Sequence, residues 1–179
     1  MNRLQEKYKK MVVPAMRQHF GYKNDLAVPK IMKVIINTGI GKFRQEKSVV
    51  EEIERELPLI AGQKAVPTQA QKAIASFKTR EGQIIGLQTT LRGERMYDFL
   101  DRLISLALPR SRDFRGLAAT SVDERGNLTI GIKEHIIFPE ISHEHVKNIF
   151  GLEVCVAVNA KTMEEGLELF KLLGFPIKR

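Results

Sequence analysis

Cations and one aromatic side chain are concentrated at 67–83, in the run PTQAQKAIASFKTREGQ. The charged and aromatic residues of this run are Lys72, Phe77, Lys78, Arg80 and Glu81. Because a cation can hold a phosphate while an aromatic ring stacks on a base, this combination favours contact with RNA. A connection of this length between two strands is uncommon in a compact domain unless it is functional or disordered. The alternative interpretation is a flexible, solvated loop.

A second cationic group follows in LPRSRDFRGL, where Arg110, Arg112 and Arg115 surround Asp113 and Phe114. Arginines at this density usually bind phosphate or carboxylate groups, since the guanidinium group matches both in a bidentate way. The three arginines are therefore candidates for further contacts with RNA or protein. The alternative is that Asp113 neutralises one of them within the protein.

Signatures of catalysis are weak. Gly39, Gly41 and Lys42 resemble part of a phosphate-binding loop, but the spacing is too short and Phe43 stands where Ser or Thr would hold magnesium. Cys155 lies in an apolar strand pattern without an adjacent base, which favours an inert thiol over a nucleophile. The sequence therefore argues against a nucleotide hydrolase and shows no acid–base constellation for another enzyme.

His143 and His145 flank Glu144 in the run SHEH. Two positions apart, the histidines would share a side only on a strand, and no second cluster completes a metal site. We interpret them as solvated polar residues. The single cysteine supplies neither an internal disulfide nor a thiolate cluster for zinc, which is typical of a reducing cytosol. We expect no metal and no cofactor.

The chain is basic, and its charge is unevenly distributed. Lys and Arg outnumber Asp and Glu by 29 to 21 in 179 residues, a formal net charge of +8, and 1–120 holds 22 basic and 12 acidic residues. A clustered excess more often marks a phosphate-binding surface, although a basic enzyme could carry it by chance. No apolar run reaches the roughly 18 residues of a membrane span, and no signal-peptide block opens the chain. We expect one cytoplasmic domain, 1–179, without membrane contact.

Apolar residues at helical spacing predict four helices. The first follows Asn2 as its N-cap and ends near Gly21. The second begins with the capping pair Ser48 and Glu51, has an acidic exposed side, and ends at Gly62. The predicted core-facing stripes are Leu4, Tyr8, Met11 and Ala15 in the first helix, and Val49, Ile53, Leu57 and Ile60 in the second.

The third and fourth helices have clear boundaries. The third covers 94–108, and Pro109 closes it because proline disfavours helix in the residue before it. The fourth begins with the capping box of Thr162 and Glu165 and ends before Gly174. The predicted stripes are Met96, Leu100, Leu103 and Ala107, and then Met163, Leu167 and Phe170.

Period-two alternation predicts strands at 31–37, 63–68, 87–92, 128–133 and 152–159. The residues expected to face the core are Met32, Val34, Ile36, Leu87, Thr89, Leu91, Leu128, Ile130, Ile132, Leu152, Val154, Val156 and Val158. Together with the helices, this pattern predicts an α+β fold. We expect a mostly antiparallel sheet with helices packed on one face and the other face open for RNA.

The open face is predicted to carry amide, hydroxyl and basic groups. Its candidate RNA-binding residues are Lys33, Asn37, Gln63, Gln88, Thr90 and Arg92. These six residues supply hydrogen-bond donors and cations and include no carboxylate, a combination that suits phosphate oxygens and ribose hydroxyls. Because aromatic stacking groups are absent, RNA would be recognised by its folded shape rather than by splayed bases. The alternative is that these residues are polar only because they face solvent.

Longer runs carry a resemblance to a known family. They are IAGQKAVPTQAQKAIASFKTREGQIIGLQTTLRGERMYDFLDRLISLALPRSRDFRGL, KIMKVIINTGIG, RGNLTIGIKEHIIFPEI and TMEEGLELFKLLGFP. These runs resemble the bacterial family of the fifth protein of the large ribosomal subunit, which binds 5S ribosomal RNA. The similarity covers essentially the whole chain. It departs at Gln71, where many members have Lys or Arg, and at Ala65, which is often Pro.

The resemblance implies a non-enzymatic α+β protein of the ribosomal central protuberance, near 23S ribosomal RNA and without a small-molecule substrate. It assigns 5S RNA binding to Lys33, Asn37, Gln63, Thr90 and Arg92, to which strand alternation adds Gln88. The loop resembles one that approaches the elbow of peptidyl-site transfer RNA, with 73–80 as its tip. The contacting residues would be Lys72, Ser76, Phe77, Lys78 and Arg80.

The resemblance also implies that 134–146 contacts protein number thirteen of the small subunit. A free RNA-binding regulator or chaperone that uses the same basic face is the leading alternative to a ribosomal protein. An enzyme is a third hypothesis, which the lack of a catalytic constellation disfavours.

Overall fold

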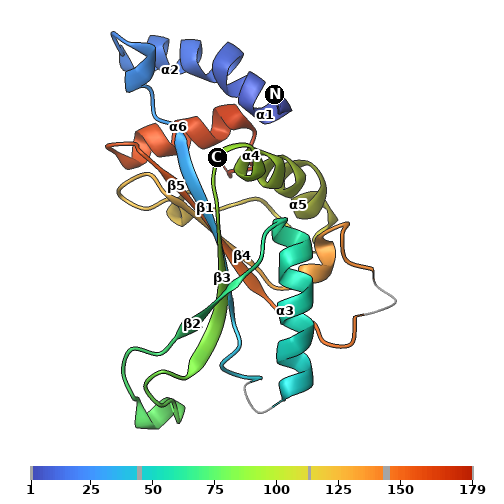
Figure 1. Cartoon of the computed structure of the whole chain (residues 1–179). Helices are drawn as coiled ribbons and strands as arrows, with labels where there is room; N and C mark the ends of the chain where they lie inside the picture. Colours follow the sequence, from blue (N-terminus) through green and yellow to red (C-terminus); the bar gives the residue numbers. More distant parts are fainter. Residues whose placement is uncertain (1, 44–45, 113, 143–145, 179) are drawn as a thin grey trace.

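Five antiparallel strands form one sheet in the order β2-β3-β1-β5-β4 (Figure 1). The strands are β1 Ile31–Gly39, β2 Val66–Gln69, β3 Ile84–Leu91, β4 Leu128–Ile132 and β5 Leu152–Val158. The computed structural model describes residues 2–43, 46–112, 114–142 and 146–178. The predicted roles of Asp113, His143, Glu144 and His145 therefore lie outside the described residues.

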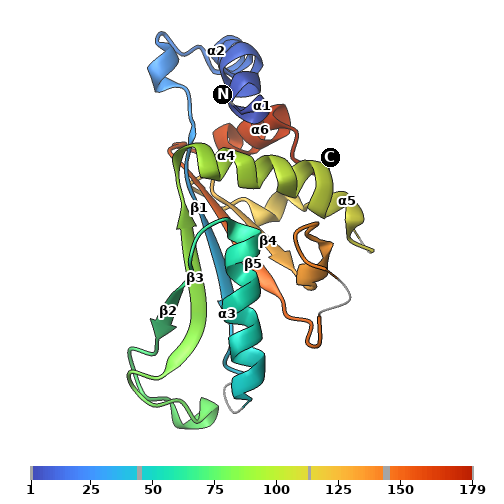
Figure 2. The ribbon, with the colours of Figure 1, turned by 45° about the vertical axis from the view of Figure 1, so that its right-hand side comes forward.

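Four helical rods accompany the sheet. Their α-helical parts are α1 Arg3–Lys7, α2 Val13–Phe20, α3 Lys47–Ala61, α4 Gly93–Arg102, α5 Leu108–Arg110 and α6 Met163–Leu173. π-helical turns over Tyr8–Val12 and Leu103–Ala107 join α1 to α2 and α4 to α5. Helices α3, α4 and α6 lie on one side of the sheet, and the α1–α2 rod packs on α4 and α6 (Figures 1 and 2). This arrangement confirms the predicted α+β fold.

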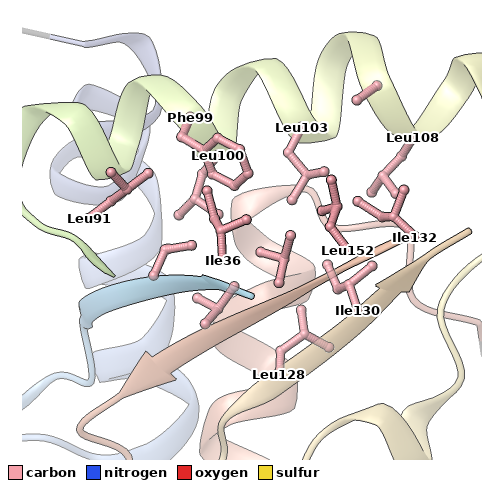
Figure 3. Packing of buried hydrophobic residues seen from close by; sticks show 14 of the residues in the cluster. Ile36, Leu91, Phe99, Leu100, Leu103, Leu108, Leu128, Ile130, Ile132 and Leu152 are labelled. Carbon is pink, nitrogen blue, oxygen red and sulfur yellow. The ribbon is translucent and has the colours of Figure 1, made fainter. Parts of the chain in front are cut away.

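The core forms where the inward side chains of the strands meet the helices. Figure 3 shows this contact between the sheet and the α4–α5 rod, with Ile36, Leu91, Leu128, Ile130, Ile132 and Leu152 close to Phe99, Leu100, Leu103 and Leu108. Burial of each such side chain contributes roughly 1.5–3 kcal/mol. The strand alternation therefore determines which face the helices cover.

The caps of three rods agree with the prediction. The side chain of Asn2 accepts a hydrogen bond from the backbone N–H of Leu4 (2.9 Å), and that of Thr162 accepts one from the N–H of Glu165 (3.3 Å). Gly21, Gly62 and Gly174 each follow a helix with a positive φ, a conformation that glycine adopts without a Cβ penalty.

The predicted stripe of the first rod is wrong in its second half. The rod buries Leu4, Val12 and Met16, whereas Met11 is 63% exposed and Ala15 is only partly buried. The π-helical turn between α1 and α2 is the cause, because it holds more residues than an α turn and rotates the following positions around the axis. Val12 and Met16 are therefore buried in place of Met11 and Ala15, one residue later in the sequence.

The predicted end of the third rod at Pro109 is also wrong, since the rod continues to Arg110. In a regular α-helix, a proline ring clashes with the carbonyl four residues earlier and lacks the N–H for that hydrogen bond. Here the π-helical turn Leu103–Ala107 ends shortly before the proline and gives the ring room. Pro14 follows the other π-helical turn at the same spacing.

Helix α3 differs from the prediction at its start and on its acidic side. It begins at Lys47, so Ser48 lies inside the helix and the capping pair with Glu51 does not form. The predicted core stripe of Val49, Ile53, Leu57 and Ile60 is buried. Glu52 and Glu56 are buried as well, because Lys147 and Asn148 contact Glu52 and His135 contacts Glu56.

Two strand assignments are corrected. Ile31 is buried and Met32 is exposed, because the pairing of β1 with β5 is irregular between Ile31 and Lys33. The second strand begins at Val66 rather than at residue 63, since the chain needs a few residues to pass from Gly62 to the sheet edge. The connection between strands is accordingly 70–83, shorter than the predicted 67–83.

Candidate nucleic-acid interface

Polar side chains line up in rows on the sheet face that points away from the helices. Asn37 of β1 is paired with Gln88 of β3 on one side and with Glu153 of β5 on the other. In the next row, Thr90 is paired with Ile35. Side chains at directly paired positions lie about 5 Å apart, so these rows form one continuous surface. The fold thus brings Asn37, Gln88 and Thr90 together as strand alternation predicts.

Lys33 and Arg92 extend this surface toward α4. They lie one position beyond the paired residues Val34 and Leu91 of β1 and β3. Arg92 is exposed and directly precedes α4, whereas Lys33 is partly buried within β1. Two cations therefore lie at the same end of the polar rows.

Gln63 is held against the end of β3 by its amide group. Its Nε2 donates to the backbone oxygen of Thr90 (3.2 Å), and Nη1 of Arg95 donates to its Oε1 (3.4 Å). The α3–β2 connection thus adds Gln63 to the same surface, and Arg95 accompanies it. Sequence analysis missed Arg95 because it lies in α4, outside the strand pattern.

The open face also carries a carboxylate outside the six candidate residues, because Glu153 is exposed there. The alternation that turns Leu152 and Val154 inward necessarily turns Glu153 and Cys155 outward. Burial raises the pKa of the Cys155 thiol. A hydrogen bond with Thr129 lowers this pKa in part, and the nearby Glu153 carboxylate raises it. The thiol is therefore mostly protonated, in agreement with an inert cysteine.

The segment 70–83 forms a hydrogen-bonded hairpin extension of β2 and β3, which we call the finger. At its base, the N–H of Ala70 donates to the oxygen of Gln83 (2.9 Å). Farther out, Ile74 and Thr79 exchange backbone hydrogen bonds of 3.0 and 3.2 Å. Figure 1 shows the finger at the end of the molecule opposite α1 and α2.

The tip of the finger presents the predicted RNA-contacting residues. A short helical turn, Ala75–Phe77, ends at Lys78, whose φ of +50° is left-handed. Such a backbone costs roughly 1–3 kcal/mol for a residue other than glycine and often marks a functional site. The ring of Phe77 is 70% exposed, and the exposed polar residues around it are Lys72, Ser76, Lys78 and Arg80.

An apolar groove lies between the finger and the chain at 39–43 and 149–151. Its apolar side chains include Phe43, Ile74, Phe77, Ile85, Ile149 and Phe150, and Lys42 and Lys72 also line it. Sequence analysis missed this groove, because Ile149 is far from the finger in the chain.

The arginine group lies away from the polar rows, at the end of α5 and just after it (Figure 2). Arg110, Arg112 and Arg115 are all exposed. Backbone hydrogen bonds of 2.8 Å from Leu117 and Lys178 join the C-terminal segment to the chain that follows the arginines. Lys178 therefore adds a fourth cation that no local sequence signal could assign to this group.

Neither a metal-binding cluster nor a membrane-spanning helix is found among the described residues. Within 2–43, 46–112, 114–142 and 146–178, no group of three or more His, Cys, Asp or Glu side chains could hold a metal ion. In the same part of the chain, no helix combines the length and apolar character needed to cross a bilayer.

The fold and the candidate site define a class: α+β proteins with helices on one face of an antiparallel sheet and a polar, partly basic second face. Within this class, two family models match the chain. The model described as Ribosomal protein L5 matches residues 24–80, and the model of the C-terminus of the same ribosomal family matches 84–177. The chain belongs to the L5 family of ribosomal proteins.

Curated relatives are similar over the full length. The chain is 49% identical over 179 residues to the large ribosomal subunit protein uL5 of Thermoanaerobacter sp. (strain X514), covering 100% of both chains. It is 51% identical over 176 residues to that of Clostridium perfringens (strain SM101 / Type A), covering 98% of both. The protein is thus a structural, non-enzymatic constituent of the large subunit of the cytoplasmic ribosome and a partner of its RNA, which confirms the resemblance seen in the sequence.

Proposed function

We propose that the open face binds 5S ribosomal RNA and holds it in the large subunit. The observation that carries this proposal is the row in which Asn37 and Gln88 are paired, with Thr90 in the next row and Lys33 and Arg92 beyond it. The amides and the hydroxyl can donate to and accept from ribose hydroxyls and base edges. The two cations supply the opposite charge that RNA phosphates need.

The composition of this face supports recognition of folded RNA. The outward side chains of β1, β3 and β5 include no aromatic ring on which an unstacked base could lie. Double-helical RNA offers ribose hydroxyls and phosphates across a shallow minor groove, which suits flat rows of amides and hydroxyls. The carboxylate of Glu153 repels phosphate, so it favours RNA poses that place a sugar or base edge, rather than the backbone, beside Asn37.

The finger is the second RNA-contacting element of the proposal, directed at the elbow of peptidyl-site transfer RNA. Its exposed Phe77 ring can stack on a base while Lys78 and Arg80 hold the backbone. Because the finger extends beyond the strands that carry Asn37 and Gln88, both RNAs can be bound at once (Figure 1). The two contacts therefore have separate roles, one as an anchor and one toward a passing ligand.

Two further contacts complete the proposal. The segment 134–146 would contact protein number thirteen of the small subunit, and its described part lies beside α3, where His135 contacts Glu56, away from the polar rows (Figure 1). Arg110, Arg112 and Arg115 would bind neighbouring 23S RNA or protein, since their exposed guanidinium groups suit phosphate or carboxylate. One hydrophobic cluster that includes Leu4, Ile53 and Phe175 supports treating 1–179 as a single domain.

A binding panel tests the proposal. The pure protein is titrated with 5S RNA, transfer RNA and an unrelated hairpin, each over a range of salt concentrations. We expect the tightest binding to 5S RNA, with a salt dependence that counts the phosphate contacts. Equal affinity for all three RNAs would contradict a dedicated 5S site. Loss of the protein from large subunits after a high-salt wash would instead favour a free RNA-binding regulator.

A further inference from the structure

Exposed apolar side chains gather in the groove between the finger and the chain at 39–43 and 149–151. Ile74, Phe77, Ile85 and Ile149 line this groove, and their exposed fractions range from 37% for Ile85 to 70% for Phe77. Among the described residues, they are four of the eleven large apolar side chains that are exposed. Single exposed apolar residues are common on a protein surface, whereas a group of them in one hollow indicates a binding site.

Three hydrogen-bonded segments form the walls of the groove. The finger wall is the hairpin described above, which backbone hydrogen bonds close along its two arms. The turn at 39–43 is fixed by the backbone N–H of Ile40, which donates to the oxygen of Ile85 (3.0 Å). The third wall is fixed by the hydroxyl of Thr38, which donates to the oxygen of Gly151 (2.5 Å). Because these contacts exist in the free protein, a partner loses less free energy to ordering the site when it binds.

The groove has room for several side chains of a partner. Its volume is about 990 Å³, and volumes of roughly 300–1,000 Å³ are usual for binding sites. Gly39 and Gly41 line it, and a Cβ at either position would meet nothing within 4 Å. The backbone of a partner can therefore approach the turn at 39–43 closely, and a side chain introduced at Gly41 would fill part of the groove.

Two lysines give the groove a positive charge. Lys42 lines it from the turn and Lys72 from the finger, so the cations belong to different walls. None of the described residues that line the groove is Asp or Glu. Within the ranges that the structure describes, neither lysine forms an ion pair with an acid of this chain. The charge that complements the groove is therefore negative.

The apolar part of the groove suits a protein better than RNA. Three of its four exposed apolar side chains are isoleucines, which pack against aliphatic groups but offer a base no ring on which to stack. RNA affinity also depends on neutralising several phosphates, and the groove supplies two cations. A peptide can instead bury its own apolar side chains against the isoleucines and place carboxylates beside the lysines.

We propose that this groove is a docking site for an acidic, apolar segment of a partner protein, with its apolar side chains against the isoleucines and its carboxylates beside Lys42 and Lys72. The docking depends only on the groove. Because Phe77 forms part of the wall, a docked segment covers the ring that is proposed to stack on transfer RNA. The partner and transfer RNA therefore exclude each other at the finger, a consequence that rests on the proposed function.

Fluorescence polarisation with labelled peptides and the full chain tests the docking. Three peptides of equal length are compared at neutral pH: one alternates leucine with glutamate, one leucine with lysine, and one serine with glutamate. We expect the leucine–glutamate peptide to bind about tenfold more tightly than either of the others, because only this peptide matches both the apolar side chains and the charge of the groove.

A side chain at Gly41 tests whether the peptide lies in the groove. Gly41→Leu should weaken binding of the leucine–glutamate peptide about tenfold, because the new side chain takes the place of one buried side chain of the peptide. Gly131→Leu is the matched control, since Gly131 lies on β4, does not line the groove, and likewise has no atom within 4 Å of a Cβ. This variant should bind the peptide as the wild type does.

A second variant keeps the test independent of the folding of Gly41→Leu. Ile149→Ser removes an apolar contact of the groove, and because Ile149 is 53% exposed, the core stays intact. We expect several-fold weaker binding of the leucine–glutamate peptide. Leu106→Ser, which removes a similarly exposed apolar side chain from the α4–α5 rod, should leave this binding unchanged.

Paired lysine variants test the charge. Lys42→Gln combined with Lys72→Gln should weaken the leucine–glutamate peptide several-fold and should reduce its advantage over the leucine–lysine peptide, because two exposed charge interactions are lost. Lys161→Gln combined with Lys171→Gln removes the same net charge near the two ends of α6 and should change neither quantity.

Three results would overturn the docking of an acidic segment. The first is equal affinity for the leucine–glutamate and leucine–lysine peptides, or full affinity of both Gly41→Leu and Ile149→Ser. The second is binding of oligouridine in place of the peptide, lost in Gly41→Leu, which would assign the groove to RNA. The third is self-association of the protein that Gly41→Leu abolishes, which would assign the groove to a second copy of this chain.

Competition with RNA separates the docking from the proposed function. The pure protein is titrated with transfer RNA and with 5S RNA, each with and without the leucine–glutamate peptide. We expect the peptide to weaken binding of transfer RNA and to leave that of 5S RNA unchanged. Peptide binding in the groove without any effect on transfer RNA would support the docking and reject the proposed contact of Phe77 with transfer RNA.

Discussion

Glu153 lies directly opposite Asn37 in the pairing of β1 with β5, so a carboxylate adjoins the amide at the centre of the polar rows. On the other side of Asn37 is Gln88, and the cations Lys33 and Arg92 lie at one end of the same strands. The face therefore mixes polar side chains with apolar ones such as Ile35, and its cations Lys33 and Arg92 lie toward α4. An RNA backbone on this face should run over the positive end, with sugars or base edges beside Glu153.

Substitution of Glu153 by Gln should strengthen 5S RNA binding, because it removes a negative charge, keeps the shape of the side chain and introduces an amide donor. We expect a gain of roughly 0.2–1 kcal/mol, the size typical of exposed charge interactions, in a filter-binding titration at low salt. Glu164→Gln, an exposed acid on α6, serves as the control and should leave the affinity unchanged. Weaker binding by Glu153→Gln would mean that the carboxylate accepts a hydrogen bond from the RNA.

Arg92→Ala should weaken 5S RNA binding by roughly 1–3 kcal/mol if the guanidinium makes a buried, charge-assisted contact. The same titration should show a shallower salt dependence, because one phosphate contact is lost. Lys171→Ala, which removes an exposed cation from α6, is the matched control. Unchanged affinity in the double variant Arg92→Ala with Asn37→Ala would move the RNA site elsewhere.

Deletion of 73–78 removes the tip of the finger and leaves the hydrogen bonds at its base between Ala70 and Gln83. The variant should bind 5S RNA normally and should reduce transfer RNA retention on assembled ribosomes. Phe77→Ala alone tests the ring, since stacking on one base contributes roughly 1–3 kcal/mol. Equal loss of 5S RNA and transfer RNA binding after the deletion would contradict separate roles.

Gly86→Ala should destabilise the fold where β2 meets β3. A Cβ at Gly86 would lie 2.8 Å from Oγ1 of Thr68 and 2.9 Å from the backbone oxygen of Thr38, so the strands would have to shift. We expect a loss of roughly 1–3 kcal/mol in the free energy of unfolding measured in urea. Gly39→Ala is the control, because Gly39 is the paired residue on β1 and a Cβ there meets nothing within 4 Å.

Strand faces were predictable from the sequence, whereas helix faces were only partly so. In β3 and β4 the alternation is unbroken, and Leu87, Leu91 and Ile130 are buried as predicted. In the first rod, helical spacing wrongly predicted that Met11 faces the core. The π-helical turn rotates the following residues around the helix axis, and no apolar pattern in the sequence marks such a turn. In the sequence, Pro14 and Pro109 each lie two residues after a π-helical turn, and Pro109 was interpreted as the end of its helix.

The residues of the candidate site were predictable where strand alternation alone places them, but not where distant segments of the chain meet. Asn37, Gln88 and Thr90 follow from alternation and lie together. The approach of Lys178 to the arginine group depends on a contact between distant parts of the chain, which no local pattern reveals. For the same reason, the acidic side of α3 was expected to be exposed, because the segment that covers Glu52 lies about a hundred residues later.

Strand β3 runs without interruption from the base of the finger, past Gln88 and Thr90, to the start of α4. A force applied to the finger tip therefore reaches the proposed 5S surface along a single covalent and hydrogen-bonded element. Bending of β3, or loss of its pairing with β1, would displace the finger relative to this surface. Because the sheet holds β3 in place, movement of a ligand at the finger tip should strain the RNA that is bound at the other end of the strand.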